Sequence, residues 1–175
     1  LYVLLNQKHD DKLRVSYSET ENVSDVKFIK HELIRETLKF FEIKKGIEVV
    51  TSADIPSSGS GLGSSSALTV GLVNAIGKFN GKNFTKSHLA NIACKIEVEK
   101  CNKPIGMQDQ FSTAFGGFNK ITFKKRGVEV TKINLSQTKL KNLNNNIMMF
   151  YTGVNRRADK ILLKIKKNKN QFKHF

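Results

Sequence analysis

Residues 56–67 read PSSGSGLGSSSA, and glycine and serine make up almost all of this stretch. It lies between a β-branched apolar run, GIEVVTSADI, and a second apolar run, ALTVGLVNAI. Glycine adopts positive φ without strain and lets other groups approach the backbone closely. A glycine-rich turn that leads into a helix directs several backbone N–H groups at one point, where the helix dipole adds positive charge. The stretch therefore predicts a strand, an anion-binding loop and a helix, with phosphate as the commonest anion.

Other interpretations of this loop fit its spacing or its flanks poorly. A P-loop needs a lysine after its last glycine, and no lysine follows Gly61 or Gly63. A dinucleotide-binding turn reads GxGxxG, and Ser64 stands where the last glycine should be. A flexible surface linker would have no reason to join two apolar runs. We therefore expect backbone amides to hold a phosphate without a lysine, with serine hydroxyls contacting phosphate or a metal ion.

Strand and helix patterns follow one another along the rest of the chain without strict alternation, which favours the α+β class. Two strand patterns joined by the turn KHDD open the chain, and Ser24 with Asp25 supplies N-cap chemistry for the first helix. Thr85 is placed to cap a later helix. The expected strands are residues 1–7, 12–18, 46–55, 118–123, 128–135 and 146–153. The expected helices are residues 24–41, 68–81, 85–100 and 107–117, followed by a basic amphipathic helix from Asn155 onward.

The composition is that of a folded soluble domain with an unusually basic balance. Apolar residues make up 39% and charged residues 26% of the 175 residues. The 30 Lys and Arg outnumber the 15 Asp and Glu, and the formal charge of +15 predicts attraction to nucleic acid, an anionic membrane or a phosphorylated small molecule. Solvated lysine-rich helix faces are the alternative reading. No apolar run approaches the ~20 residues of a membrane span, so we expect no membrane partner.

The two cysteines, Cys94 and Cys101, have no second pair with which to form a zinc site. We expect both to be reduced and largely buried, which suits a cytoplasmic protein.

Residues 56–67 resemble the second signature of the GHMP kinases, in which a proline precedes Gly-Leu-Gly-Ser-Ser-Ala. Ser66 stands where that family usually has alanine. A second stretch agrees: Glu97 after Ala93, then Asp109 within GMQDQ, is similar to the galactokinase-type segment that carries an acidic residue and the catalytic aspartate. The resemblance covers nearly the whole chain and is greatest to the subgroup of bacterial D-glycero-D-manno-heptose 7-phosphate kinases. The residues that match the signature are Pro56, Gly61, Leu62, Gly63, Ser64 and Ser65.

The resemblance implies the N-terminal lobe of a GHMP kinase, a fold related to a ribosomal-protein second domain. Residues 1–145 would form this ATP-binding lobe without its first strand and motif, and residues 146–175 would begin the C-terminal lobe. The first and third family signatures are expected outside the chain, which then looks like the middle of a two-lobed kinase. Association into a homodimer would cover a face that such a fragment leaves exposed.

The resemblance also implies transfer of the γ-phosphoryl group of ATP to a sugar hydroxyl, here the anomeric hydroxyl of heptose 7-phosphate. Ser65 and Glu97 would hold Mg²⁺, with Glu99 as the alternative ligand on the opposite side of a helix. Asp109 would act as general base or as an electrostatic anchor for the acceptor hydroxyl. The nucleotide phosphates would be held by Pro56, Ser58, Gly59, Ser60, Gly61, Leu62, Gly63, Ser64, Ser65 and Ser66.

Three arginines are candidates for holding the phosphate of the sugar. Arg156 and Arg157, in TGVNRRAD, would lie in the first turn of the last helix, where a guanidinium fork and the helix dipole both favour an anion. Arg14 is the third. Two other functions stay open: a basic nucleic-acid-binding protein of the related ribosomal fold, and an inactive kinase fragment that serves as a binding module. No aromatic-basic recognition motif supports a nucleic-acid partner, so we do not expect one.

Overall fold

The computed structural model describes residues 1–54 and 61–150. A four-stranded sheet has the order β1 (Tyr2–Gln7), β4 (Ile47–Ser52), β2 (Leu13–Ser16) and β3 (Thr20–Val23). β2 and β4 run parallel, while the β1–β4 and β2–β3 pairs are antiparallel. A separate antiparallel hairpin consists of β5 (Asn119–Lys124) and β6 (Gly127–Lys132). The fold is α+β, as expected.

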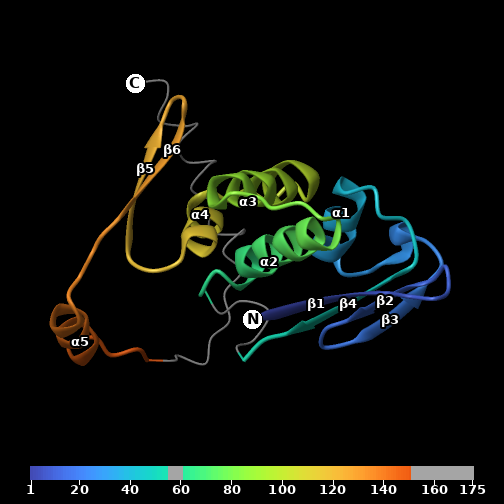
Figure 1. Cartoon of the computed structure of the whole chain (residues 1–175), viewed down its shortest axis with the longest axis horizontal. Coiled ribbons are helices and arrows are strands. Elements are labelled where there is room, and N and C mark those ends of the chain that lie inside the picture. Colours follow the sequence, from blue (N-terminus) through green and yellow to red (C-terminus); the bar gives the residue numbers. More distant parts are fainter. Residues whose placement is uncertain (55–60, 151–175) are drawn as a thin grey trace, which may run out of the picture.

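The helices gather on one face of the sheet (Figure 1). Helices α1 (Glu32–Phe40) and α2 (Ser64–Phe79) pack directly on it, and α3 (Lys86–Cys94) and α4 (Gln108–Phe115) form the next layer. A π-helix, η2 (Lys95–Lys100), continues α3. The short 3-10 helix η1 (Val26–Phe28) precedes α1, and α5 (Gln137–Asn145) lies near the end of the described chain.

Three apolar clusters join these layers in succession. The first packs Leu13 and Val49 of the sheet against α1 and α2. The second lies between α1, α2 and α3, and the third joins α3 and α4 to the β5–β6 hairpin through Phe111. Helix α2 contributes to the first two clusters, so its position is set from two sides.

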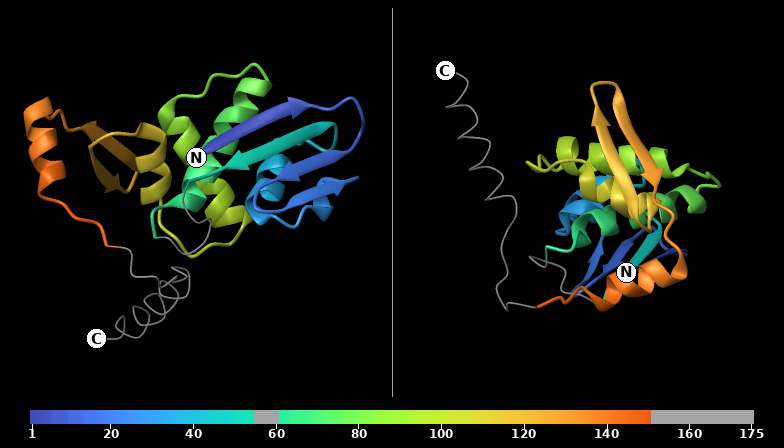
Figure 2. Two further views of the ribbon diagram at one scale, coloured as in Figure 1. Left: turned by 90° about the horizontal axis from the view of Figure 1, so that it is seen from below. Right: turned by 90° about the vertical axis from the view of Figure 1, so that its left-hand side faces the viewer.

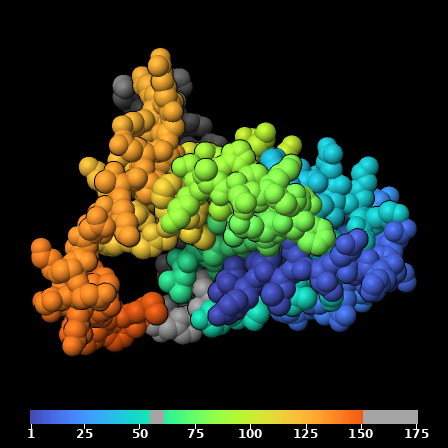
Figure 3. Space-filling view, in the orientation of Figure 1, coloured from blue at the N-terminus to red at the C-terminus, as the bar shows by residue number. Residues whose placement is uncertain are grey.

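The hairpin and α5 stand away from the body that the sheet and the helices form (Figures 2 and 3). No residue of α5 is buried. On the other side of the sheet from the helices, Tyr2 and Leu4 of the edge strand β1 are exposed. Among the described residues, no helix is both long and apolar enough to cross a membrane.

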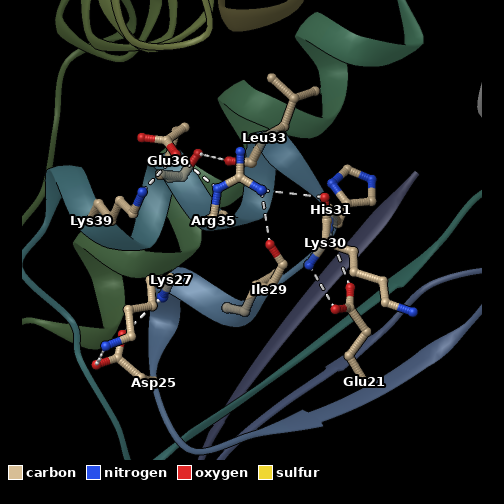
Figure 4. A network of polar contacts seen from close by, with 11 residues as sticks. Glu21, Asp25, Lys27, Ile29, Lys30, His31, Leu33, Arg35, Glu36 and Lys39 are labelled. Carbon is tan, nitrogen blue, oxygen red and sulfur yellow. Dashed lines mark hydrogen bonds and ion pairs between the residues drawn. The ribbon is translucent and has the colours of Figure 1, made fainter.

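A buried carboxylate ties β3 to the beginning of α1 (Figure 4). Glu21 is 7% exposed and accepts hydrogen bonds from the N–H of Lys30 (2.7 Å), the N–H of His31 (3.2 Å) and the hydroxyl of Tyr17 (3.0 Å). Burial raises the pKa of Glu21, but these three donors outweigh it and the net pKa is lowered. Burial, followed by the hydrogen bond to Glu21, raises the pKa of Tyr17 to about 12. On the adjoining turn, Arg35 donates to the carbonyl oxygen of Ile29 (2.9 Å).

This carboxylate explains why the helix predicted over residues 24–41 is wrong as a single element. Ile29 is extended, with φ −65° and ψ 122°, and separates η1 from α1. The N–H groups of Lys30 and His31 bond to Glu21 in place of helix carbonyls. Asp25 does act as an N-cap, but for η1, where it accepts the N–H of Lys27 at 2.9 Å.

The two strands predicted over residues 1–7 and 12–18 both exist, but they are not neighbours because β4 lies between them. Ile47 and Val49 of β4 are fully buried, whereas alternate side chains of β1 are exposed. The strand that buries more apolar surface takes the central place, and β1 takes the edge.

Near the end of the described chain, the strand predicted over residues 146–153 is wrong where it can be compared. Residues 147–150 are irregular and exposed, and no described strand pairs with them; residues 151–153 lie outside the described part. Helix α5 was not predicted. Ser136 caps it by accepting the N–H of Lys139, but its sequence carries little apolar periodicity.

The remaining predictions that fall on described residues hold, while the basic helix predicted from Asn155 onward lies outside the described part of the chain. The strand before the loop is β4, and the helix after it is α2, which ends at Phe79 with Asn80 as its C-cap. Thr85 caps α3 by accepting the N–H of His88, and α4 ends at a pair of glycines with positive φ. The two strands after α4 pair as β5 and β6.

Candidate active site

Helix α2 begins in the glycine-serine loop, as the sequence predicts. Gly61 (φ 70°) and Gly63 (φ 69°) both have positive φ, and Gly63 is the N-cap residue, which has no side chain to cap the helix. Ala67 is the residue whose N–H bonds to the carbonyl oxygen of Gly63, at 2.9 Å. The first N–H groups of an α-helix have no acceptor within the helix itself, and the positive end of its dipole lies at the same end. This is the local geometry of an anion site.

The hydroxyl of Ser65, in the first turn of α2, donates to Oε2 of Glu97 at 3.2 Å. Glu97 is fully buried, and its other oxygen, Oε1, has no hydrogen-bond partner among the described residues. A buried carboxylate is costly unless charges or donors compensate it. The hydrogen bond from one neutral hydroxyl offsets little of the cost of burying this charge, so the carboxylate is suited to binding a cation.

The π-helix η2 determines which acidic residue faces inward. The N–H of Cys101 bonds to the carbonyl of Ile96 at 2.9 Å, five residues earlier, in the wide-turn pattern. Within this segment Glu97 is buried and Glu99 is exposed. The structure therefore favours Glu97 over Glu99 as the inward-facing carboxylate. Single π-turns inside α-helices often occur at functional sites.

Asp109 reaches the same turn of α2 from a third element. It lies in the first turn of α4, its side chain is exposed, and its carboxyl carbon is 3.6 Å from the point where a Cβ on Gly63 would lie. Any larger side chain at position 63 would occupy the space beside this carboxylate. The loop between η2 and α4 thus brings Glu97 and Asp109 to one turn of α2, together with Ser65.

The donors of this site fit Mg²⁺ in the presence of a nucleotide. Mg²⁺ takes oxygen ligands, usually one or two from the protein, with phosphates and waters completing the shell. Ser65 Oγ and the Glu97 carboxylate supply such oxygens, and Oε1, which has no partner among the described residues, is available to a further ligand. The part of the chain that the structure describes contains no group of three or more His, Cys, Asp or Glu side chains arranged to hold a metal by themselves. A metal here would depend on bound phosphate.

The other predicted site residues lie in different surroundings. Leu62 is 55% exposed, and Ser66 is buried on the inner side of α2. Arg14 is not brought to the first turn of α2: it lies on β2 in register with Glu48 and pairs with that residue at 3.3 Å. Six predicted residues lie outside the described part of the chain: Pro56, Ser58, Gly59, Ser60, Arg156 and Arg157.

One residue of the site region was not given a role from the sequence. Gln110 is fully buried in the first turn of α4, and neither polar atom of its amide has a hydrogen-bond partner within the described chain. The sequence could have indicated that Gln110 is buried, because it is adjacent to Phe111 and falls on the side of an amphipathic helix that faces the core.

The cysteines are free and buried, as expected. Burial raises the pKa of Cys94 and that of Cys101 to about 11, so both are protonated thiols at neutral pH.

Comparison with known proteins agrees with this geometry. A family model for the GHMP kinases N terminal domain matches residues 27–117. This segment holds β4, α2, α3, η2 and α4, and with them Ser65, Glu97 and Asp109. The chain belongs to the GHMP kinases.

Among its relatives are sugar kinases. The chain is 33% identical over 112 residues to D-glycero-alpha-D-manno-heptose 7-phosphate kinase of Campylobacter jejuni, a match that covers 63% of this chain and 33% of that protein. It is 39% identical over 70 residues to a galactokinase of Thermotoga petrophila, covering 40% of this chain and 20% of that one.

A solved D-glycero-D-manno-heptose 1-phosphate kinase from Bacteriodes thetaiotaomicron has the same fold, with a TM-score of 0.70 and 21% identity over 78% of this chain and 48% of that one. The chain thus spans a third or less of the two curated relatives and about half of the solved kinase.

Proposed function

We propose that the intact protein is an ATP- and Mg²⁺-dependent sugar kinase. The observation that carries the proposal is the convergence of Ser65, Glu97 and Asp109 on the first turn of α2, at the end of a glycine-serine loop. Phosphoryl transfer depends mainly on positioning and on neutralising charge. These requirements match three neighbouring features: the N-terminus of α2, the buried carboxylate of Glu97 and the exposed carboxylate of Asp109.

In this proposal, the loop amides and the start of α2 bind the phosphates of ATP, and Ser65 with Glu97 holds the metal. Mg²⁺ bound there would neutralise charge that develops on the transferred phosphoryl group. Because Gly63 lacks a side chain, the acceptor can approach the phosphates beside Asp109. The predicted domain division at residue 145 belongs to the same proposal, and residues 27–117 of the first part match the family.

Asp109 would meet the hydroxyl group that attacks. The acceptor oxygen forms a bond to the γ-phosphorus, the bond from that phosphorus to the β–γ bridging oxygen breaks, and ADP leaves. The hydroxyl proton passes to the Asp109 carboxylate if that residue acts as a base, or to solvent if it acts as an electrostatic anchor.

The proposed acceptor is heptose 7-phosphate, phosphorylated at its anomeric hydroxyl. The support for a heptose phosphate is the name of the Campylobacter jejuni relative, and the galactokinase relative makes galactose the main competing acceptor. Arg156 and Arg157 stay predicted ligands of the sugar phosphate. Arg14 could join them only by exchanging its ion pair with Glu48.

A coupled ADP-release assay of the intact protein tests the proposal against a panel of sugars and sugar phosphates, with and without Mg²⁺. We expect Mg²⁺-dependent turnover that is fastest with heptose 7-phosphate. Turnover of galactose but not of heptose 7-phosphate would keep the sugar kinase and refute the acceptor. Binding of Mg²⁺-ATP without turnover of any sugar would refute the kinase and favour an inactive binding module, while salt-sensitive RNA binding without nucleotide binding would favour the nucleic-acid alternative.

A further inference from the structure

Helix α4 carries a buried polar residue, Gln110, that has no role in the proposed function. Gln110 is completely buried, yet its Oε1 and Nε2 lack hydrogen-bond partners among the described residues. A buried amide without hydrogen-bond partners destabilises the folded state. Interior polar groups of this kind are normally satisfied by an ordered water molecule.

Gln110 and Glu97 lie on two elements, α4 and η2, that both contact α2. Gln110 follows Asp109, whose carboxyl carbon is 3.6 Å from the Cβ position of Gly63. Ser65, two residues beyond Gly63, bonds to Glu97. Asp109, the residue before Gln110, and Glu97 therefore reach the same turn of α2 from two different elements. Helix α4 also packs on both α2 and α3, the helix that η2 continues.

The unsatisfied atoms are chemically complementary. Glu97 Oε1 is a buried acceptor without a donor, while Gln110 offers both a buried donor, Nε2, and a buried acceptor, Oε1. The two side chains are not hydrogen-bonded to each other directly. A buried water typically makes about three hydrogen bonds, and these three atoms are the kind of partners it needs.

We infer that Gln110 is a positioning residue for Glu97 and acts through a buried water molecule. The water donates to Glu97 Oε1 and bonds to the Gln110 amide, which holds the carboxylate with Oε2 toward Ser65. This inference rests on the proposed function, since it treats Glu97 as the metal ligand. Hydrogen-bonded supports behind a metal ligand usually contribute ten- to hundredfold to metal affinity.

The test compares the same substitution at two glutamines of α4. Gln110→Met removes the buried amide at similar volume, and Gln108→Met makes the same change at an exposed position of the same helix. The measurement is the Mg²⁺ concentration that half-saturates the thermal stabilisation of the intact protein by ATP. We expect Gln110→Met to raise it ten- to hundredfold without lowering the melting temperature of the ligand-free protein, and Gln108→Met to leave it unchanged.

A high-resolution crystal structure of the wild-type protein gives a second readout that needs no variant. We expect a water within hydrogen-bonding distance of both Glu97 Oε1 and the Gln110 amide. Its absence would overturn the inference, as would an unchanged Mg²⁺ half-saturation in Gln110→Met beside a normal wild-type response. A wild-type protein without any Mg²⁺ response would instead refute the proposed function, and the inference with it.

Discussion

Glu21 and Glu97 are both buried glutamates, and their surroundings differ in one decisive respect. Glu21 accepts two backbone N–H groups and the hydroxyl of Tyr17, and neither of its oxygens lacks a partner. Glu97 accepts one serine hydroxyl, and its Oε1 has no partner in the described chain. The described residues provide hydrogen-bond partners for both oxygens of Glu21 but for only one oxygen of Glu97.

We propose that this difference separates a structural carboxylate from one that binds a ligand. Glu21 is paired wholly within β3, the loop before α1 and Tyr17, so its charge holds the edge of the sheet to a helix (Figure 4). Glu97 lies on a π-helix and bonds to Ser65 in the first turn of α2, where we propose that phosphate binds. A fold gains nothing by burying an unsatisfied carboxylate, because hydrogen bonds must offset the loss of solvation. We therefore expect one substitution, Glu to Gln, to have opposite consequences at the two positions.

The largest expected effect is on turnover in Glu97→Gln. The amide keeps the size of the side chain but removes the negative charge that would bind Mg²⁺, and we expect kcat to fall about 10³-fold, a change of about 4 kcal/mol in the activation barrier. The melting temperature of the ligand-free protein should stay the same or rise, since a buried and poorly compensated charge is removed. Steady-state kinetics and thermal unfolding of the intact protein measure the two quantities.

Glu99→Gln is the matched control for this experiment. It makes the same change two residues further along the same π-helix, on an exposed side chain. We expect neither kcat nor stability to change measurably. Equal losses of turnover in Glu97→Gln and Glu99→Gln would contradict the assignment of the inward-facing carboxylate.

The second effect is on stability in Glu21→Gln. The new NH₂ group would face the N–H groups of Lys30 and His31, so a charge-assisted acceptor is replaced in part by a competing donor. We expect the free energy of unfolding to fall by about 2 kcal/mol, with kcat per folded molecule unchanged. Urea denaturation gives the first value and an active-site titration the second. Loss of turnover with full stability would show that Glu21 belongs to the active site.

The two glutamates also show what could be predicted from the sequence. The loop around Gly63 and the residues Ser65, Glu97 and Asp109 lie in short motifs whose chemistry can be interpreted locally, and the structure brings these side chains to one turn of α2. Helical spacing predicted that Glu97 and Glu99 would not both face inward, and the structure shows that Glu97 is the buried one. The composition of residues 56–67 predicted the anion-binding loop, whereas the roles of Ser65, Glu97 and Asp109 came from the resemblance of their motifs to the GHMP kinases.

The Glu21 network was not predicted, because it depends on pairings that distant residues decide. Nothing in the sequence TENV indicates that Glu21 will be buried or that TENV will form an edge strand. The break between η1 and α1 follows from that buried carboxylate, since apolar periodicity continues across it. The central position of β4 is likewise decided by which strand buries the most apolar surface. A local turn pattern such as KHDD does not show this.

The smallest expected effect is the pH dependence of stability that Glu21 contributes. The pKa of Glu21 is lower in the folded protein than the value of about 4.3 in an unfolded chain. Its stabilisation is therefore fully present above the unfolded pKa and is lost as the pH falls through the folded pKa. We expect the unfolding free energies of wild type and Glu21→Gln, measured by urea denaturation from pH 6 to pH 3, to converge toward acid.

His31 would complicate this comparison, because it contacts the Tyr17 ring, burial lowers its pKa, and the Glu21 charge acts on it. The measurement is therefore made in a His31→Phe background, which keeps an aromatic ring against Tyr17 and removes the titrating imidazole. Asp10, Glu36 and Glu129 also have lowered pKa values, but they contribute equally to both curves and cancel in the difference. A difference between wild type and Glu21→Gln that stays constant down to pH 3 would mean that the charge of Glu21 contributes nothing, and that the shape of its hydrogen bonds alone holds β3 to α1.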